Sequence, residues 1–148
     1  MAKFVYKMQS LLNIKEKLEE QAKTAYGLAR MTLNEEEAKL AQLIARKEQY
    51  VEQKRQEMSS SINVHELTQL EHAIKSMEYR IAEQILVVKQ AEKNVQLAQA
   101  KLENAMKERK IQEKLKEHAF EEFLKQQVDE KFTFEETVEL LKGIFADG

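Results

Sequence analysis

A chain of 148 residues with no proline, no cysteine and 34% charged residues excludes several classes of protein. Because proline inside a helix costs about 3 kcal/mol, its absence favours long, uninterrupted helices. Without cysteine, neither a disulfide framework nor a thiolate metal site can form. A net charge of −2 predicts no nucleic-acid partner. The sequence contains no run of about 18 apolar residues, so we expect no membrane span.

The composition is typical of a coiled coil, since it is rich in Glu, Lys, Gln, Ala and Leu. Charge is balanced along most of the chain, with 11 basic and 9 acidic groups in residues 1–58 and 11 of each in residues 63–128. Residues 129–148 differ, because they carry 2 basic and 6 acidic groups. The sequence therefore predicts a helical hairpin over residues 1–127 and an acidic amphipathic tail over residues 128–148.

The first helix is predicted over about residues 3–59, where apolar and small residues recur at steps of three and four. Two consecutive steps of four, from Ala25 to Ala29 to Leu33, predict a stutter in this face. Lys47 and Lys54 fall on the same face, so we expect looser packing toward the end of the helix. The predicted face consists of Phe4, Met8, Leu11, Leu18, Ala22, Ala25, Ala29, Leu33, Leu40, Leu43, Tyr50 and Met58.

A turn is predicted at about residues 60–63, within the stretch Ser59-Ser60-Ser61-Ile62-Asn63. Asn63 can cap a following helix, and Glu66 can reach back to it in a capping box. With a turn here, the chain is a hairpin whose two ends come together. Without one, it is a single rod that must dimerise to bury its apolar face.

The second helix is predicted over about residues 64–127 and has the cleaner repeat. Gln84 is the polar interruption, which either sets the register of the two helices or marks a wetter patch. Ile85, Leu86 and Val87 adjoin Val88 and extend the apolar surface beyond one face, so another helix or a partner should cover them. The repeat consists of Leu67, Leu70, Ile74, Met77, Ile81, Val88, Ala91, Val95, Ala98, Leu102 and Ala105.

After Ala105 the apolar stripe is predicted to continue through Ile111, Leu115, Ala119 and Phe123. Helices rise about 1.5 Å per residue, so a turn near residues 59–63 would place Phe4 beside residues 118–123.

The tail contains a second capping pattern, Thr133-Phe134-Glu135-Glu136. Phe134, Val138, Leu141 and Phe145 follow at helical spacing and predict a short amphipathic helix. This helix either folds back on the hairpin, frays, or serves as a ligand for a groove on a partner.

No catalytic, cofactor or metal site is predicted. His65 and His72 share a helical face, but no cysteine or suitably placed carboxylate accompanies them. A pair of long helices offers no concave pocket that would exclude water. We therefore expect no enzyme, no cofactor, no nucleic acid and no small-molecule substrate.

Four motifs occur in a characteristic order. They are Phe4-x-Tyr6-x-x-Gln9-x-Leu11-Leu12-x-Ile14-Lys15, Glu19-Glu20-Gln21-Ala22, Val64-x-Glu66-Leu67 and Glu113-Lys114-Leu115-Lys116-Glu117-x-x-Phe120-x-x-Phe123. With this spacing and chain length, residues 1–127 resemble the flagellar export protein family FliJ of type III secretion. The tail departs from the family pattern, because the acidic pair Asp129-Glu130 arrives early.

The resemblance implies an antiparallel two-helix coiled coil, similar to the stalk of rotary ATPases. It implies binding to the hexameric export ATPase FliI, promotion of its assembly and activity, and contact with the transmembrane gate protein FlhA. Flagellar export chaperones are further implied partners. The implied location is cytoplasmic, at the cytoplasmic face of the inner membrane and held there through partners.

The resemblance also implies two sets of contact residues. For the ATPase they are Phe4, Tyr6, Leu11, Ile14, Phe120 and Phe123, and for the gate they are Leu43, Tyr50, Ala73 and Met77. Several of these residues also lie on the predicted seam. Two other interpretations stay open: a structural coiled coil that dimerises, and a chaperone-like binder of client helices that uses Ile85–Val88.

Overall fold

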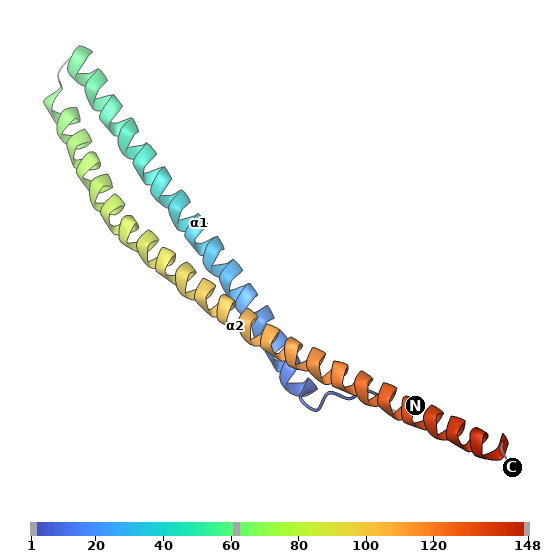
Figure 1. Cartoon of the computed structure of the whole chain (residues 1–148). Helices are drawn as coiled ribbons and strands as arrows, with labels where there is room; N and C mark the ends of the chain where they lie inside the picture. The colour runs from blue at the N-terminus through green and yellow to red at the C-terminus, as the bar shows by residue number, and fades with distance from the viewer. Residues whose placement is uncertain (1–2, 61–62, 147–148) are drawn as a thin grey trace. The chain divides into compact units, whose positions relative to one another are not determined.

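The computed structural model describes residues 3–60 and 63–146. It consists of two long helices, α1 (Gln9–Ser60) and α2 (Val64–Ala146), drawn from blue to green and from green to red in Figure 1. The helices pack against each other in antiparallel orientation, and the described residues contain no strand. This confirms the predicted all-α helical hairpin.

Contacts divide the chain into two units, one formed by residues 1–20 and 104–148 and the other by residues 21–103. We call them the terminal unit and the turn unit. The apolar core lies in the turn unit, where Leu33 of α1 packs with Val88, Ala91 and Val95 of α2. The partly buried side chains against it are Tyr26, Ala29 and Leu40.

The seam of α1 follows a strict repeat of three and four residues. Tyr26 occupies the seam and Ala25 is exposed, so the predicted stutter is wrong. Tyr26 rather than Ala25 faces α2, because an aromatic ring buries far more apolar area than the methyl group of alanine. The predicted face members Met8, Leu18 and Met58 are likewise exposed. The buried and half-buried seam positions are Leu12, Lys15, Glu19, Ala22, Tyr26, Ala29, Leu33, Glu36, Leu40, Leu43, Lys47, Tyr50, Lys54 and Glu57.

The seam of α2 keeps the same repeat from Leu67 to Phe123, beyond the apolar stretch that ends at Ala105. The predicted continuation through Ile111 and Leu115 is wrong, because these side chains are 57% and 46% exposed. Polar side chains continue the register instead, since helix geometry sets which positions face α1 regardless of their polarity. The half-buried positions that continue this repeat after Ala105 are Arg109, Gln112, Lys116, Ala119 and Phe123.

Gln84 lies in the seam and makes a specific contact across it. Its Nε2 donates a hydrogen bond to the backbone carbonyl of Glu36 at 3.0 Å and another to the Glu36 carboxylate. This bond, followed by one from Lys39, lowers the pKa of Glu36. Gln84 is therefore paired with one α1 residue, as a register-setting residue requires.

The turn is capped as predicted at Asn63, while residues 61–62 lie outside the described residues. Asn63 Oδ1 accepts hydrogen bonds from the backbone N–H groups of His65 and Glu66 at 3.1 and 3.3 Å. The Glu66 carboxyl forms a hydrogen bond with Glu57 of α1. The Asn63 half of the predicted capping box is therefore confirmed.

The helix α1 begins at Gln9, later than the predicted start near residue 3. Residues 3–6 are not helical, and Tyr6 and Met8 carbonyls accept the bonds that open the helix. An extended segment advances about 3.3 Å per residue, against about 1.5 Å in a helix. From this segment Phe4 contacts the rings of Phe120 and Phe123.

The helix α2 continues to Ala146, past the predicted end near residue 127. No Gly or Pro interrupts residues 105–142, so nothing ends the helix there. The predicted capping pattern at residues 133–136 does not start a new helix, because the chain before it is already helical. The side chains of Phe134 and Phe145 lie outside those described. The division into a hairpin and a tail stays a prediction.

Leucine-to-alanine substitutions in α1 test the assignment of the seam. We expect Leu33→Ala to lower the free energy of unfolding by about 2–3 kcal/mol, because Leu33 is 7% exposed within the apolar core. Leu28→Ala is the matched control, since Leu28 is 59% exposed on the same helix and its loss should cost less than about 0.5 kcal/mol. Urea unfolding followed by circular dichroism measures both, and equal losses would contradict the seam.

Candidate protein-interaction surfaces

An aromatic cluster joins the N-terminal segment to α2 in the terminal unit. The ring of Phe4 lies 5.1 Å from that of Phe120, edge-on at 70°, and 5.5 Å from that of Phe123. Pairs with this geometry contribute about 0.5–1.5 kcal/mol each beyond the area they bury. The prediction that Phe4 reaches residues 118–123 is confirmed. Phe120 remains 43% exposed, so one ring both packs and forms surface.

Polar contacts then hold α1 to α2 within the same unit. The Tyr6 hydroxyl donates to Oε1 of Gln112 at 3.3 Å, and Nζ of Lys15 donates to Glu108 at 2.9 Å. Gln112 is one of the polar residues in the α2 seam. These contacts align the N-terminal segment and the first turns of α1 along α2.

The carboxylate of Glu19 is only 5% exposed, so it needs a partner of opposite charge more than the other polar groups of this unit do. It is paired with the guanidinium of Arg109, which also contacts Glu113 at 2.8 Å. The hydrogen bonds that Arg109 donates to Glu113 and, with a smaller effect, to Glu19 raise the pKa of Arg109. A buried charge is tolerated when a partner of opposite charge is in place. The terminal unit thus contains a buried charged pair in addition to the aromatic cluster and the buried Leu12.

An exposed apolar strip runs along both helices of the terminal unit. Ile14 and Leu18 of α1 are 53% and 43% exposed, and they immediately precede the seam residues Lys15 and Glu19. Ile111 and Leu115 of α2 precede seam positions in the same way. Because the helices are antiparallel, equal offsets from the seam fall on the same side of the pair. We call Leu11, Ile14, Leu18, Ile111 and Leu115 the terminal strip.

The residues implied as ATPase contacts all fall in this one unit. Ile14 and Phe120 are exposed, whereas Phe4, Tyr6, Leu11 and Phe123 are half-buried. A groove of about 520 Å³ opens beside Phe4 and Phe120. The sequence analysis missed Ile111, Leu115 and Leu18 as surface residues because it assigned apolar residues to the seam. A strict repeat would have separated them, since each lies one position before it.

The residues implied as gate contacts fall in the turn unit but differ in exposure. Tyr50 and Ala73 line one groove of about 700 Å³, which lies where the sequence predicts looser packing. Leu43 is half-buried, and Met77 is only 6% exposed. Met77 therefore packs inside the helical pair and offers almost no side-chain surface.

The same groove contains a pair of neighbouring carboxyl groups, Glu57 and Glu66. Their shared hydrogen bond raises the pKa of Glu57, with desolvation and the negative charge of Glu66 adding to the effect. Arg46 adds a cation near this region, with its guanidinium 6.0 Å from the Tyr50 ring centre. The groove therefore combines an aromatic ring with two carboxyl groups, and Arg46 lies outside the groove lining.

The apolar residues beside Val88 form a second exposed patch. Ile85, Leu86 and Val87 are 39%, 67% and 44% exposed, while Val88 is buried in the core. This matches the expectation that two helices cannot cover the whole run. These three residues lie in the turn unit.

Within residues 3–60 and 63–146, no group of three or more His, Cys, Asp or Glu side chains lies close enough together to hold a metal ion. Nε2 of His65 lies 3.3 Å from Nε2 of Gln69. None of the described helices is both long and apolar enough to cross a membrane.

Comparison with known proteins identifies what this chain is similar to. A family model described as flagellar FliJ protein matches residues 4–130. The solved structure of a putative YscO homolog, CT670, from Chlamydia trachomatis superposes with a TM-score of 0.55 and 22% sequence identity, covering 95% of this chain and 93% of that chain. At 22% identity this structural match supports the fold alone. No curated protein matches significantly.

The pairing of Glu19 with Arg109 is testable by thermal unfolding. We expect Arg109→Leu to lower the melting temperature by several degrees, because it removes the guanidinium that is paired with the buried Glu19 carboxylate. The double variant Glu19→Leu with Arg109→Leu should recover much of this loss, since two apolar side chains can fill the site. A double variant less stable than Arg109→Leu alone would contradict the pairing.

The Glu57–Glu66 pair predicts a dependence of stability on pH. Because the pKa of Glu57 is raised in the folded state, its protonated form favours folding below the ordinary value of 4.5, and this contribution is lost as pH rises through the folded-state pKa. Glu57→Gln should therefore raise the melting temperature at neutral pH and have little effect below pH 4.5. Glu48→Gln, on the same helix, is the control, and an equal gain there would disprove a specific repulsion.

Proposed function

This chain belongs to the flagellar FliJ family, and on that basis we propose that it is a non-enzymatic stalk of the flagellar type III export apparatus. It binds the hexameric export ATPase FliI and promotes assembly and activity of the ATPase ring. It also links the ring to the export gate protein FlhA at the cytoplasmic face of the membrane and exchanges with export chaperones. The observation that carries the proposal is the family match over residues 4–130.

The surface of the terminal unit supports an ATPase contact there. Interfaces draw most of their affinity from a few apolar or aromatic anchors surrounded by polar residues. The terminal strip supplies exposed Ile14 and Ile111, and the aromatic cluster supplies Phe120. Leu11, Phe4, Tyr6 and Phe123 support these anchors from half-buried positions. We therefore assign ATPase binding to the terminal strip together with the aromatic cluster.

The groove of the turn unit supports a gate contact. Tyr50 is a good anchor, because an aromatic ring with a hydroxyl gives large contact area and a hydrogen bond at low entropic cost. Ala73 lies in the same groove, and Leu43 is half-buried further along α1. Met77 would act by packing beneath this surface. In this scheme catalysis belongs to the ATPase, and the chain contributes surfaces that position it.

The exposed patch at Ile85–Val87 favours a second candidate function, a chaperone-like binding of client helices. Ile85, Leu86 and Val87 are 39–67% exposed on successive faces of α2, and an amphipathic client helix would cover one of these faces. Loss of client binding in Ile85→Lys with Val87→Glu, at unchanged helicity, would support this function. Unchanged stimulation of the ATPase by that variant would separate it from the first.

ATP hydrolysis and ring formation by the purified export ATPase test the primary proposal. We expect the chain to increase both, and Ile14→Glu with Leu115→Glu to weaken binding by about tenfold or more, since two exposed anchors of the terminal strip are lost. Leu28→Glu with Leu97→Glu changes two residues of similar exposure in the turn unit and should leave stimulation unchanged.

The readouts are phosphate release, light scattering of the ring and circular dichroism of each variant. If the native chain changes neither hydrolysis nor ring formation, the stalk function is wrong. If the control pair loses as much stimulation as the strip pair, the assignment to the terminal strip is wrong.

A further inference from the structure

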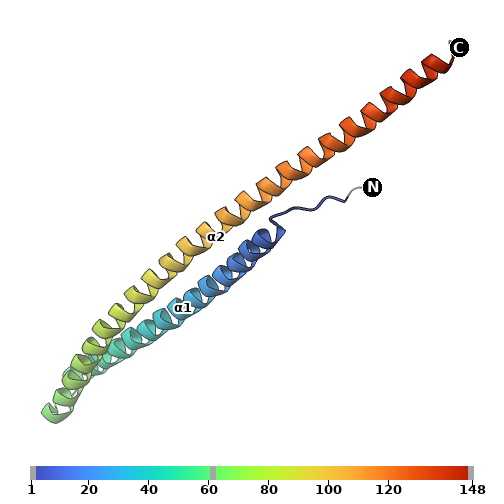
Figure 2. The ribbon, with the colours of Figure 1, turned by 90° about the horizontal axis from the view of Figure 1, so that it is seen from below.

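The helix α2 continues past the last ring contact that the N-terminal segment makes with it. Phe4 reaches Phe123, and α2 runs on to Ala146 (Figure 2). We call Leu124–Ala146 the overhang. It has 23 residues, so it is about 35 Å long at about 1.5 Å per residue. A helix of this length offers a substantial face to a partner.

The overhang begins a second heptad seam that is offset by one residue from the seam facing α1. The first seam ends through Ala119 and Phe123, whereas the second starts at the neighbouring positions Phe120 and Leu124. The steps alternate strictly between three and four over more than three heptads, which is the length that a coiled coil requires. The positions are Phe120, Leu124, Gln127, Lys131, Phe134, Val138, Leu141 and Phe145.

Three of the described side chains on the second seam are exposed. Phe120, Leu124 and Leu141 are 43%, 45% and 48% exposed, and Val138 is half-buried. Val128, which flanks the seam, is 64% exposed. An apolar row that stays in water along a helix lowers its free energy when another helix covers it.

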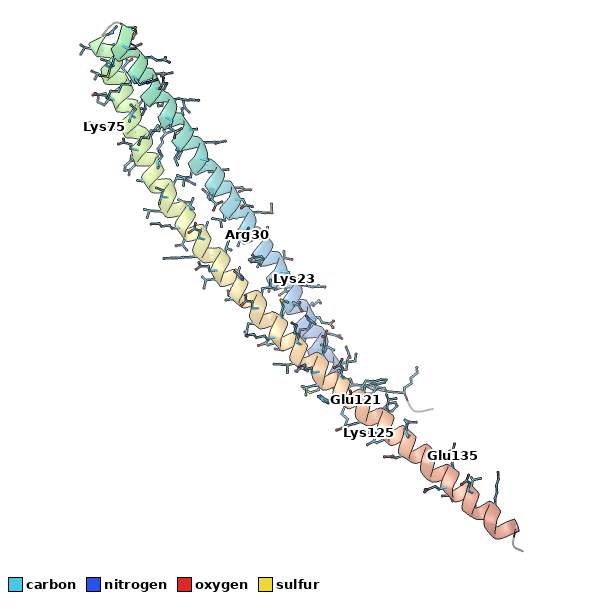
Figure 3. All side chains as sticks on the ribbon, turned by 45° about the horizontal axis from the view of Figure 1, so that its top comes forward. Lys23, Arg30, Lys75, Glu121, Lys125 and Glu135 are labelled. Atoms are coloured by element: carbon cyan, nitrogen blue, oxygen red, sulfur yellow. The ribbon has the colours of Figure 1, made fainter. Side chains whose placement is uncertain are left out.

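Charge identifies the kind of helix that fits. Between Phe120 and Ala146 the sequence has seven acidic and three basic residues. The positions that flank a coiled-coil seam set partner choice, and here they hold Glu121, Glu130 and Glu135 against Lys142. Figure 3 labels Glu121 and Glu135 along this part of α2. A partner with Lys or Arg at its own flanking positions would pair with these carboxylates.

A second copy of the chain fits the overhang poorly. Two overhangs would bring two acidic helices together, and like charges across a helix pair are destabilising. In a parallel, in-register pair the seam position Lys131 would also oppose itself. We propose that the overhang is a docking site for a basic amphipathic helix of another protein.

A labelled peptide binding assay with the full chain tests this site. The probe is a synthetic helix of about four heptads with Leu at the seam positions and Lys at the flanking positions, and its twin carries Glu at the flanking positions. Anisotropy titrations should give a dissociation constant at least about tenfold lower for the Lys peptide. High salt should reduce this preference, because screening weakens exposed charge pairs.

Matched variants locate the binding. Leu124→Asp with Leu141→Asp should weaken binding of the Lys peptide by about tenfold or more. Leu28→Asp with Leu97→Asp is the control, since these two leucines are exposed in the turn unit and should leave binding unchanged. Circular dichroism confirms that helicity is kept in each variant.

Three results would overturn the proposal. They are no saturable binding of the Lys peptide, equal binding of both peptides, and equal losses in the two variant pairs. Analytical sedimentation measures whether the native chain dimerises. A dimer that is lost in the double variant Leu124→Asp with Leu141→Asp would show that a second copy of the chain covers this face. The peptide assay contains no ATPase, so its failure is distinguishable from failure of the stalk function.

Discussion

The contact seam between α1 and α2 is the constraint on which the rest of the structure depends. A helical pair has no centre to fill, so each residue is either on the shared face or in water. Few of the side chains that the structure describes are deeply buried, and these are Leu12, Glu19, Leu33, Met77, Val88, Ala91 and Val95. Stability must therefore come from the repetition of modest contacts along the seam. The strict repeat of three and four residues provides this repetition, because it keeps one face of each helix toward the other.

Polar residues within the seam determine how the two helices align. Apolar side chains alone would allow α1 and α2 to slip by a heptad, since one Leu or Ala contact resembles the next. A slip would separate Gln84 from Glu36 and leave the buried carboxylate of Glu19 without Arg109. Breaking such pairs is costly because the groups have already lost their water. The alignment also places Phe4 against Phe120, so the candidate ATPase surface depends on the same pairs.

The sequence was sufficient for the fold class, the cap at Asn63 and the position of Phe4 along α2. These follow from strong local signals: the absence of proline, a side-chain oxygen before a helix, and the rise per residue. The sequence was not sufficient to predict which way a residue faces when a polar residue lies in the seam or an apolar residue lies outside it. Arg109 and Gln112 are polar but face α1, whereas Ile111 and Leu115 are apolar but exposed. Following the period strictly, and polarity only afterwards, would have recovered the terminal strip.

The change of seam at the end of the hairpin explains why one helix can serve two contacts. Up to Phe123 the residues at three- and four-residue steps face α1 or the N-terminal segment. From Phe120 onward a second set follows the same steps, and its members Leu124 and Leu141 are exposed. The two sets are neighbours on the helix, so they overlap over residues 119–124 and cannot be covered by the same partner helix. Phe120 stands where they meet, because it touches Phe4 and remains 43% exposed. A partner bound to the second seam would therefore contact a residue that also holds the N-terminal segment, and binding there would be coupled to the packing of Phe4.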